Sequence, residues 1–453
     1  MSAHSWNTLP TELKLHTIGF LRLESVKTLS EVSYETYALC VPSLFRSVTL
    51  NSCEALSSFM RHVPKPYYHH IRSLSLCLKP SLASSSPIDQ TSALIDILTW
   101  ATRVESLSLH FIGSPAKCII PSFQNLHDLR SLYMSNCGDE NSQPLSERLV
   151  VSIALAIPQL QELTLDKITR SQIHAPDLLG TRIPIVIGDN DIEDHPIVGS
   201  ALSLPSLLQI PTLQQLRIRD THLGDCWWKS ATCLAPLSVL DLGSCCHVSP
   251  EVGRTHVEAI VRNVASTSPV NRLAIATGLE QTEFRHLTTP LKSLRHLELT
   301  SFFPVDSIAD TLSTLSGSPI ETVAVQCFND DVEDLCESLE TFLNERVERG
   351  PGQFHQQLKK LFITLVPLEG DEETAGLSSA QLYEALEEQQ RDAIKKLEDF
   401  CRDLGLECGV LGISVSGSCC ASAVGFGGLR HTSVRTSAEE AVPISKALTS
   451  SCL

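Results

Sequence analysis

The feature that most constrains this chain is a short apolar pattern that recurs along most of its length. Each copy consists of an apolar residue, two variable residues, a second apolar residue, one variable residue and a third apolar residue. The middle residues of successive copies lie between 24 and 53 positions apart, an irregular spacing typical of a solenoid with insertions. The ten copies are Ile71, Leu74 and Leu76; Val104, Leu107 and Leu109; Leu129, Leu132 and Met134; Leu160, Leu163 and Leu165; Leu213, Leu216 and Ile218; Leu237, Leu240 and Leu242; Val270, Leu273 and Ile275; Leu294, Leu297 and Leu299; Ile320, Val323 and Val325; and Leu358, Leu361 and Ile363.

Each copy predicts one short strand, because its last two apolar residues are two positions apart and therefore point to the same face. A lone strand has nothing to pair with, whereas stacked copies form a parallel sheet over a continuous core. Amphipathic stretches between the copies predict helices at residues 88–102, 146–157, 254–265, 306–315 and 331–347. The alternation predicts an α/β solenoid, a curved parallel sheet with helices on its convex side.

Other segments depart from the regular spacing. Residues 166–205 account for the longest gap and contain the acidic, turn-rich run GDNDIEDHP, so we expect a loop insertion there. Residues 380–404 predict a long helix that stops at Gly405, and residues 410–415 predict a last strand. After Ser416 the chain is rich in Ser, Gly and Cys without periodicity, so we expect a disordered tail over 416–453.

Composition argues against several classes of protein. With 42% hydrophobic and 19% charged residues over 453 positions, the chain can bury a sizeable core and is not largely disordered. A net charge of −17 has the wrong sign for binding nucleic acid or an anionic membrane. The 16 cysteines lack the paired spacings of structural zinc sites, and residues 1–14 lack a secretory signal. We therefore expect free thiols, no metal, no cofactor and a place in the cytoplasm or the nucleus.

Catalytic signatures do not occur in the sequence. Residues 412–416, GISVS, miss the nucleophile elbow because Ser stands where the closing Gly belongs. There is no Walker lysine loop, no GxGxxG and no HExxH. We expect a protein without catalytic residues rather than an enzyme.

The first 50 residues carry a separate pattern. Apolar positions three to five residues apart predict three short helices, and Pro10 followed by Glu12 is a plausible start for the first. The segment resembles an F-box, in which an LPxE opening, an apolar helix, a VS step and a closing PxLFRxVxL occur in this order. Two departures are Thr17, where an apolar residue is common, and Tyr34-Glu35, where a basic residue is frequent. The matching residues are Leu9, Pro10, Glu12, Leu13, Ile18, Leu21, Val26, Leu29, Val32, Ser33, Tyr37, Pro42, Leu44, Phe45 and Val48.

The resemblance implies a small all-α F-box over 1–50, followed by a solenoid over 51–415 that looks like the irregular leucine-rich repeats of many F-box proteins. F-boxes dock on the small Skp-family adaptor of cullin-RING ubiquitin ligases, and the attached repeats hold a protein substrate. Adaptor contact would use apolar side chains that the helices leave exposed, although some candidates must hold the three helices together. The adaptor-binding candidates are Leu9, Pro10, Ile18, Leu21 and Val32.

Substrate contact would use the variable positions beside the inward-facing apolar residues of the strands. For each such residue by itself, a solvated strand position is the more economical interpretation. The adjacent Trp227 and Trp228 fit an aromatic binding anchor, and they fit packing over an edge of the solenoid better. The substrate-binding candidates are Arg217, Arg219, Trp227, Trp228, Asp241, His296 and Glu298.

Two hypotheses about function therefore stand. In the first, the chain is the substrate-recognition adaptor subunit of an Skp/cullin/F-box ubiquitin ligase. In the second, it is a leucine-rich-repeat interaction scaffold outside the ligase, and the F-box-like segment only caps the solenoid.

Overall fold

The main feature of the computed structural model is one sheet of twelve parallel strands, paired in the order β1-β2-β3-β4-β5-β8-β9-β10-β11-β12-β13-β14. The structure describes Trp6 and residues 9–78, 87–244, 250–279, 291–350, 354–366 and 388–412. The strands of this sheet are β1 (Ser47–Leu50), β2 (Ser73–Cys77), β3 (Ser106–Phe111), β4 (Ser131–Asn136), β5 (Glu162–Asp166), β8 (Gln215–Arg219), β9 (Val239–Ser244), β10 (Arg272–Ile275), β11 (His296–Leu299), β12 (Thr322–Phe328), β13 (Lys360–Val366) and β14 (Glu407–Gly412).

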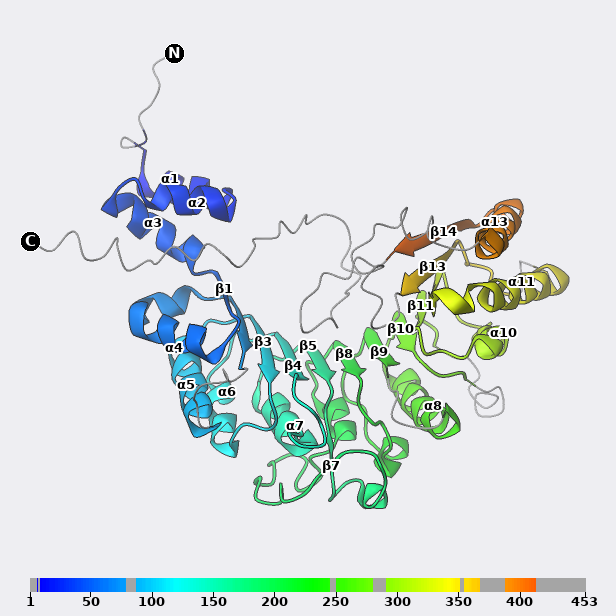
Figure 1. Cartoon of the computed structure of the whole chain (residues 1–453), viewed down its shortest axis with the longest axis horizontal. Helices are drawn as coiled ribbons and strands as arrows, with labels where there is room; N and C mark the ends of the chain where they lie inside the picture. Colours follow the sequence, from blue (N-terminus) through cyan, green and yellow to red (C-terminus); the bar gives the residue numbers. More distant parts are fainter. Residues whose placement is uncertain are drawn as a thin grey trace, which may run out of the picture.

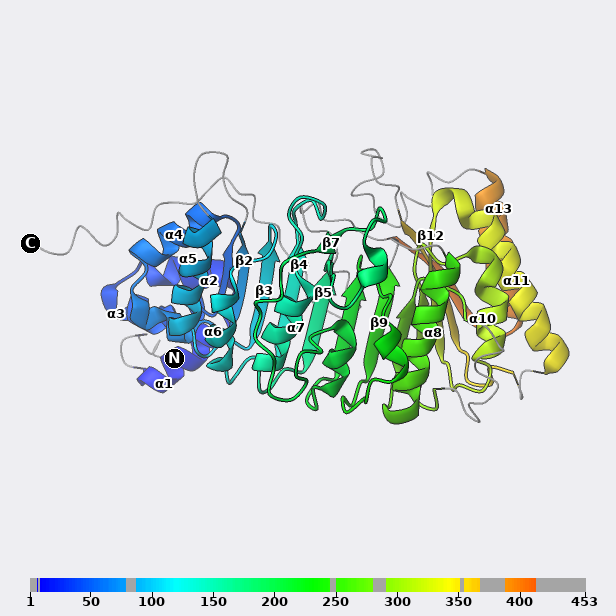
Figure 2. The same cartoon turned by 90° about the horizontal axis from the view of Figure 1, so that it is seen from below.

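Helices cover the outer side of the curved sheet, and the strands line its inner side (Figure 1). Figure 2 shows the same helices side by side along the solenoid. Short 3-10 helices take the place of an α-helix after β5 and after β8, namely η5 (Leu204–Gln209) and η6 (Cys226–Lys229). The α-helices of this layer are α4 (Cys53–His62), α5 (Pro87–Trp100), α6 (Ile120–Gln124), α7 (Glu147–Ala156), α8 (Pro250–Thr267), α10 (Ile308–Thr314), α11 (Val332–Arg349) and α13 (Glu388–Asp403).

The repeated apolar residues form continuous rows across the sheet. Leu163 of β5 lies opposite Leu216 of β8, and Leu165 lies opposite Ile218, in a register that the neighbouring strands continue. These side chains are buried against the apolar faces of the helices in one core that extends from Val48 to Leu406. The ten predicted strands and the α/β solenoid are therefore confirmed.

The predicted helices are also present, with ends that differ by a few residues. The helix expected at 254–265 is longer, because α8 runs from Pro250 to Thr267. The last strand begins at Glu407, three positions before the expected start. Residues 380–387 of the predicted long helix, residues 413–415 and the predicted tail lie outside the described residues.

Three short helices precede the solenoid, as the sequence predicts: α1 (Thr11–Gly19), α2 (Leu23–Ser30) and α3 (Tyr34–Leu44). Ile18, Val26 and Cys40 bury their side chains in a small cluster of their own, separate from the solenoid core. The helices lie beyond β1 at one end of the arc (Figure 1).

The insertion at 166–205 folds against the outer side of the arc, where β7 is labelled in Figure 1. It contains a two-stranded parallel sheet, β6 (Arg170–Ser171) with β7 (Ile185–Val186), and the short helix η4 (Pro176–Leu178). Arg148 of α7 donates hydrogen bonds to three backbone carbonyls of the insertion, those of residues 189, 192 and 200. The insertion is thus a folded part of the molecule.

Candidate functional site on the concave face

The concave face is built from the strand residues that alternate with the buried leucines. On β8, for example, Leu216 and Ile218 point into the core, so Arg217 and Arg219 point to the open side. The parallel register brings such residues from neighbouring strands next to one another. We call the following set the central polar patch: Tyr133, Glu162, Asp166, Gln215, Arg217, Arg219, Asp241, Arg272, His296 and Glu298.

Arg219 and Asp241 form the shortest ion pair of this patch. The Arg219 Nη2 donates to Asp241 Oδ2 at 2.7 Å, and the same oxygen lies 4.0 Å from Arg217 Nε. Burial lowers the pKa of Arg219, but the carboxylates of Asp241, Glu298 and Asp166 together outweigh burial, so the pKa of Arg219 is raised overall. The structure therefore brings these three predicted residues together, with both guanidinium groups held by one carboxylate.

A second polar group lies two strands further along the sheet. Arg272 donates to Glu298 Oε2 at 3.2 Å, and Gln326 of β12 donates to Glu298 Oε1 at 2.7 Å. His296 is exposed next to Arg272, and partial burial together with this cation lowers the pKa of His296. His296 and Glu298 thus lie on the concave face, as predicted.

Asp166 is one of the patch residues that sequence reasoning missed, and the most buried of those. It ends β5 on the concave face but is only 5% exposed, and Tyr133 donates a hydrogen bond to its Oδ2 at 3.0 Å. The other oxygen, Oδ1, has no hydrogen-bond partner among the described residues. Burial and the charge of Asp220 raise the pKa of Asp166 from 3.8 to about 6. A buried carboxyl with an unmatched oxygen costs stability, and such groups are frequent at functional sites.

Trp227 and Trp228 belong to the other side of the molecule. Both lie in η6, which packs on α8, where Asn263 donates to the backbone carbonyl of Trp228. The Trp228 indole is fully buried, and its Nε1 donates to the carbonyl of Leu223 at 2.8 Å. Trp228 is therefore a core residue, and the candidate substrate role for it is wrong because no part of its side chain reaches the surface. Trp227 is 57% exposed, but the helical layer separates it from the central polar patch.

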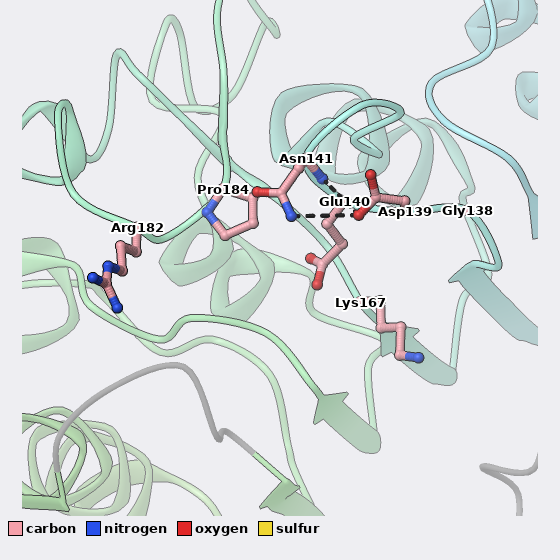
Figure 3. Close-up of a pocket in the computed structure, with 7 residues that line it drawn as sticks. All are labelled: Gly138, Asp139, Glu140, Asn141, Lys167, Arg182 and Pro184. Carbon is pink, nitrogen blue, oxygen red and sulfur yellow. Dashed lines mark hydrogen bonds between the residues drawn. The ribbon is translucent and has the colours of Figure 1, made fainter.

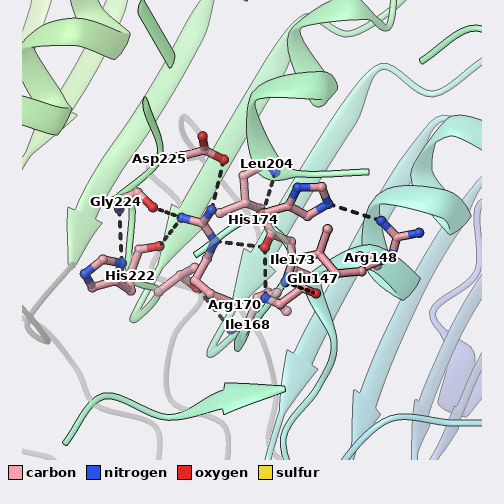
Figure 4. Close-up of polar contacts among 12 residues, drawn as sticks. Glu147, Arg148, Ile168, Arg170, Ile173, His174, Leu204, His222, Gly224 and Asp225 are labelled. Carbon is pink, nitrogen blue, oxygen red and sulfur yellow. Dashed lines mark hydrogen bonds and ion pairs between the residues drawn. The ribbon is translucent and has the colours of Figure 1, made fainter. Parts of the chain in front are cut away.

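A buried ionic network fixes η6 to the insertion (Figure 4). Arg170 donates through Nε to Glu147 at 2.8 Å and through Nη2 to Asp225 at 2.9 Å, and all three side chains are fully buried. Its Nη1 donates to the carbonyls of His222 and Gly224. Burial raises the pKa of Asp225 despite the opposing charge of Arg170. The Arg170 guanidinium and its two carboxylate partners are thus engaged in holding η6 to the insertion. We therefore regard this network as a structural anchor rather than a reactive site.

A pocket of about 340 Å³ lies where loops following β4 and β5 meet the insertion (Figure 3). Asp139 closes the first loop by accepting hydrogen bonds from Asn141 and Ser142, which lower its pKa. Two carboxylates and two cations line the pocket, so its charge does not select one class of ligand. The lining residues are Gly138, Asp139, Glu140, Asn141, Lys167, Arg182 and Pro184.

The structure separates the five adaptor-binding candidates. Pro10, Leu21 and Val32 are exposed, and Leu9 is half-buried. Ile18 is 1% exposed in the small N-terminal cluster, so its side chain holds the helices together and presents no surface to a partner. Other exposed apolar residues of the same segment were not among the adaptor-binding candidates: Leu13, Leu15, Phe20, Leu23 and Tyr34.

The part of the chain that the structure describes shows neither a metal-binding cluster nor a membrane-spanning helix. Its His, Cys, Asp and Glu side chains form no group of three or more that could hold a metal ion. None of its helices combines the length and the apolar character that crossing a bilayer requires.

Comparison with known proteins adds little to this picture. No family model matches the chain, and no curated protein matches it significantly. Among solved structures, the leucine-rich repeat-containing protein LegL7 from Legionella pneumophila is 12% identical, with a TM-score of 0.34, over 79% of this chain and 86% of that one. An internalin, inlF, from Listeria monocytogenes is 14% identical, with a TM-score of 0.26, over 73% and 92%. A chain of the Rad7 and Elc1 complex in yeast is 12% identical, with a TM-score of 0.34, over 81% and 95%. We draw nothing about function from these likenesses.

Proposed function

We propose that this protein is the substrate-recognition subunit of an Skp/cullin/F-box ubiquitin ligase. In this proposal the three N-terminal helices bind the Skp-family adaptor, and through it the cullin, while the concave face of the repeats binds a protein substrate. The observation that carries the proposal is a set of exposed apolar side chains between α1 and the start of α3, joined directly to a repeat solenoid.

This N-terminal apolar surface is unusually concentrated. Of the sixteen exposed large hydrophobic side chains in the described chain, seven lie between residues 13 and 34. Exposed apolar patches mark interaction sites in soluble proteins, and we propose that these side chains serve as one. The seven residues that define the surface are Leu13, Leu15, Phe20, Leu21, Leu23, Val32 and Tyr34.

Capping the solenoid does not account for this surface. The first repeat is already closed by β1 and α4, whose residues Val48, Leu50 and Leu56 belong to the solenoid core. The N-terminal helices have their own cluster around Ile18, and seven large apolar side chains of this segment remain exposed. A cap would turn such side chains toward the repeats, whereas a docking module leaves them for a partner.

The concave face supports the second half of the proposal. It offers charged groups already held in place by Arg219 with Asp241 and by Arg272 with Glu298. Side chains that are fixed before binding lose less conformational entropy when a partner arrives. A substrate held there would be close to the ligase subunits that transfer ubiquitin, so this chain would act through effective concentration and needs no catalytic residue of its own. We accordingly propose a non-catalytic role in the cytoplasm or the nucleus.

The test is binding of the purified 453-residue chain to an Skp-family adaptor by calorimetry. The double substitution Phe20→Ala with Val32→Ala removes two side chains that are 78% and 71% exposed, so the fold should be retained. We expect the affinity to fall at least about tenfold, since truncating central apolar contacts of an interface commonly costs more than 1 kcal/mol each. The matched control is Phe302→Ala with Val347→Ala, which removes two exposed apolar side chains from the opposite half of the solenoid and should leave affinity unchanged.

Either of two results would overturn the adaptor assignment. The first is a folded wild-type chain that does not bind the adaptor, and the second is binding that survives the loss of Phe20 and Val32. Both would favour the scaffold hypothesis, in which the concave face binds a partner without any ligase.

A further inference from the structure

Positive charge is in excess on the concave face between β8 and β11, strands that line the inner side of the arc (Figure 1). On β8 and β9, Arg217 and Arg219 share one carboxylate, that of Asp241. On β10 and β11, Arg272 pairs with Glu298, and Glu298 also interacts electrostatically with Arg219. The two groups are therefore neighbours, with three guanidinium groups to two carboxylates.

The excess continues at the amino ends of the next strands. Arg295 immediately precedes β11, Lys359 immediately precedes β13, and both donate to the carboxylate of Glu321. His296 connects this group to Arg272, since the charges of Arg272, Glu321 and Arg295 all act on its ring. We call the following set the cationic strip: Arg217, Arg219, Arg272, Arg295 and Lys359, with the carboxylates Asp241, Glu298 and Glu321.

The cations of the strip are more accessible than the carboxylates that hold them. The side chain of Arg217 is 26% exposed, and that of Asp241 is 8% exposed. For Arg272 and Glu298 the exposed fractions are 26% and 14%. Glu321 is likewise less exposed than its two cations. A partner that approaches the strip would therefore meet mainly guanidinium and ammonium groups.

Acidic side chains limit the strip toward the N-terminal end of the solenoid. Glu162 and Asp166 lie on β5, and Asp220 directly follows β8. These carboxyl groups would repel a negatively charged partner. A partner that follows the positive charge would therefore extend from β8 toward β13.

We propose that the cationic strip binds an acidic segment of the protein substrate through Asp and Glu side chains. The proposal rests on the proposed function, in which the concave face holds the substrate, and it adds the chemical class of that substrate. Five cations and three carboxylates leave an excess of two positive charges, which carboxylates of a partner would neutralise. Guanidinium groups form charge-assisted hydrogen bonds with carboxylates, and the strip already holds its guanidinium groups in place.

Carboxylates suit the strip better than phosphates. Its excess charge is spread over strands that lie about 5 Å apart, so single charges side by side match it. A phosphate monoester would place about two negative charges on one group close to Asp241 and Glu298. A nucleic acid would also be repelled by the net charge of −17, whereas a short acidic segment meets mainly the charges within about 8 Å, because salt screens the rest.

The experiment measures the fluorescence anisotropy of a fluorescein-labelled peptide of alternating Glu and Ser residues, titrated with the purified 453-residue chain. We expect the peptide to bind, and the affinity to fall at least about tenfold when NaCl is raised from about 0.05 M to about 0.5 M. The same peptide with Gln in place of every Glu should not bind.

The test variant is Arg217→Gln with Arg272→Gln. It should weaken binding of the Glu peptide at least about tenfold, because two charge-assisted contacts are lost. Asp241 and Glu298 each keep another hydrogen-bond donor in this variant, so the fold should be retained.

The matched control is Arg349→Gln with Arg402→Gln. It removes the same charge from α11 and α13 on the convex side, where both arginines are at least half-exposed, and it should leave binding unchanged. Equal losses in the two double variants, or equal binding of the Glu and Gln peptides, would overturn the proposal. So would tighter binding of an oligothymidylate strand, or of the Gln peptide phosphorylated on its Ser residues, than of the Glu peptide.

Adaptor binding separates this result from the ligase assignment. The variant Arg217→Gln with Arg272→Gln should bind the adaptor as wild type does, because the N-terminal helices lie beyond β1, away from the strip (Figure 1). A chain that binds the adaptor but not the Glu peptide would refute the acidic substrate alone. A chain that binds the Glu peptide but not the adaptor would support the cationic strip and refute the ligase role.

Discussion

Replacing Asp166 by Asn should make the protein more stable at neutral pH, although a buried hydrogen bond is altered. The carboxyl is 5% exposed, its Oδ1 lacks a partner among the described residues, and its pKa is raised from 3.8 to about 6. A folded-state pKa above the unfolded value means that the native state binds the proton more tightly. The resulting penalty is fully present above pH 6 and disappears as the pH falls below 4.

The size of the effect follows from this shift. About two pKa units at 1.36 kcal/mol each give a penalty of about 3 kcal/mol at pH 7.5, and about 1 kcal/mol remains at pH 4.5. The Asn side chain has no such penalty, while its altered hydrogen bonding costs about 1 kcal/mol at every pH. The difference in free energy of unfolding between the variant and wild type should therefore increase by about 2 kcal/mol, in favour of the variant, from pH 4.5 to pH 7.5. The constant cost of the altered hydrogen bond cancels in this comparison.

Urea unfolding followed by circular dichroism at the two pH values measures this difference. Glu162→Gln is the matched control, because it removes a carboxylate from the same strand and face at a half-exposed position that Gln215 already contacts. The control should show a much smaller change with pH. If Asp166→Asn destabilises the protein equally at both pH values, the carboxyl is not held in the unfavourable state that the structure indicates.

Other substitutions test burial elsewhere in the molecule. Arg170→Met should cost about 3–5 kcal/mol in urea unfolding, because it leaves two fully buried carboxylates without their cation; a cost below about 1 kcal/mol would contradict the network. Trp228→Ala should cost about 3–5 kcal/mol and Trp227→Ala about 0.5 kcal/mol or less, and equal losses in thermal unfolding would refute the assignment of one to the core and one to the surface. Ile18→Ala should cost about 2–5 kcal/mol in local stability, seen as faster hydrogen exchange in α1–α3 while exchange in the repeat strands stays unchanged.

The strands and their register could be read from the sequence because burial in this fold is local and periodic. Leu216 and Ile218 occupy the same places in their repeat as Leu240 and Leu242 in the next one. Stacking repeats in register then predicts that Arg217 faces Asp241, and the structure pairs these residues across β8 and β9. The repeat pattern therefore predicts which charged residues are neighbours on the concave face.

Asp166 was missed because its environment is not local. It follows the last leucine of β5, and its strand pairs with β8 only after a 40-residue insertion has been placed on the outer side. The environment of Asp166 includes Tyr133 of one neighbouring strand, which donates a hydrogen bond to it, and Asp220, which follows the other strand and, together with burial, raises its pKa. A signal existed in the sequence, since Ser135 and Arg219 hold the same repeat position as Asp166 on the strands at either side.

The two Trp residues show a different limit of sequence reasoning. Their spacing after β8 identified a loop, but nothing in the pattern said on which side of the sheet that loop returns. In the structure, η6 packs on α8 on the convex side. The ion pair between Arg170 and Asp225 joins η6 to a segment 55 residues earlier in the chain. The sequence also could not tell that Ile18 is buried and Leu21 exposed. An apolar residue in a bundle of three short helices can face either the other helices or the surface.

Glu35, part of one of the two departures from the F-box pattern noted in the sequence, has a structural partner. Its Oε1 accepts from Lys14 Nζ at 3.0 Å, and the Lys14 side chain is 6% exposed, so this carboxylate balances a nearly buried ammonium group between α1 and α3. Glu35→Lys should loosen the N-terminal helices by about 1 kcal/mol or less, because the pair with the largely exposed Glu35 is lost and two cations then face each other. Hydrogen exchange of α1–α3 measures this, and the charge swap Lys14→Glu with Glu35→Lys should restore most of the protection. If Glu35→Lys instead leaves exchange unchanged and strengthens adaptor binding, Glu35 acts at the docking surface and its contact with Lys14 is incidental.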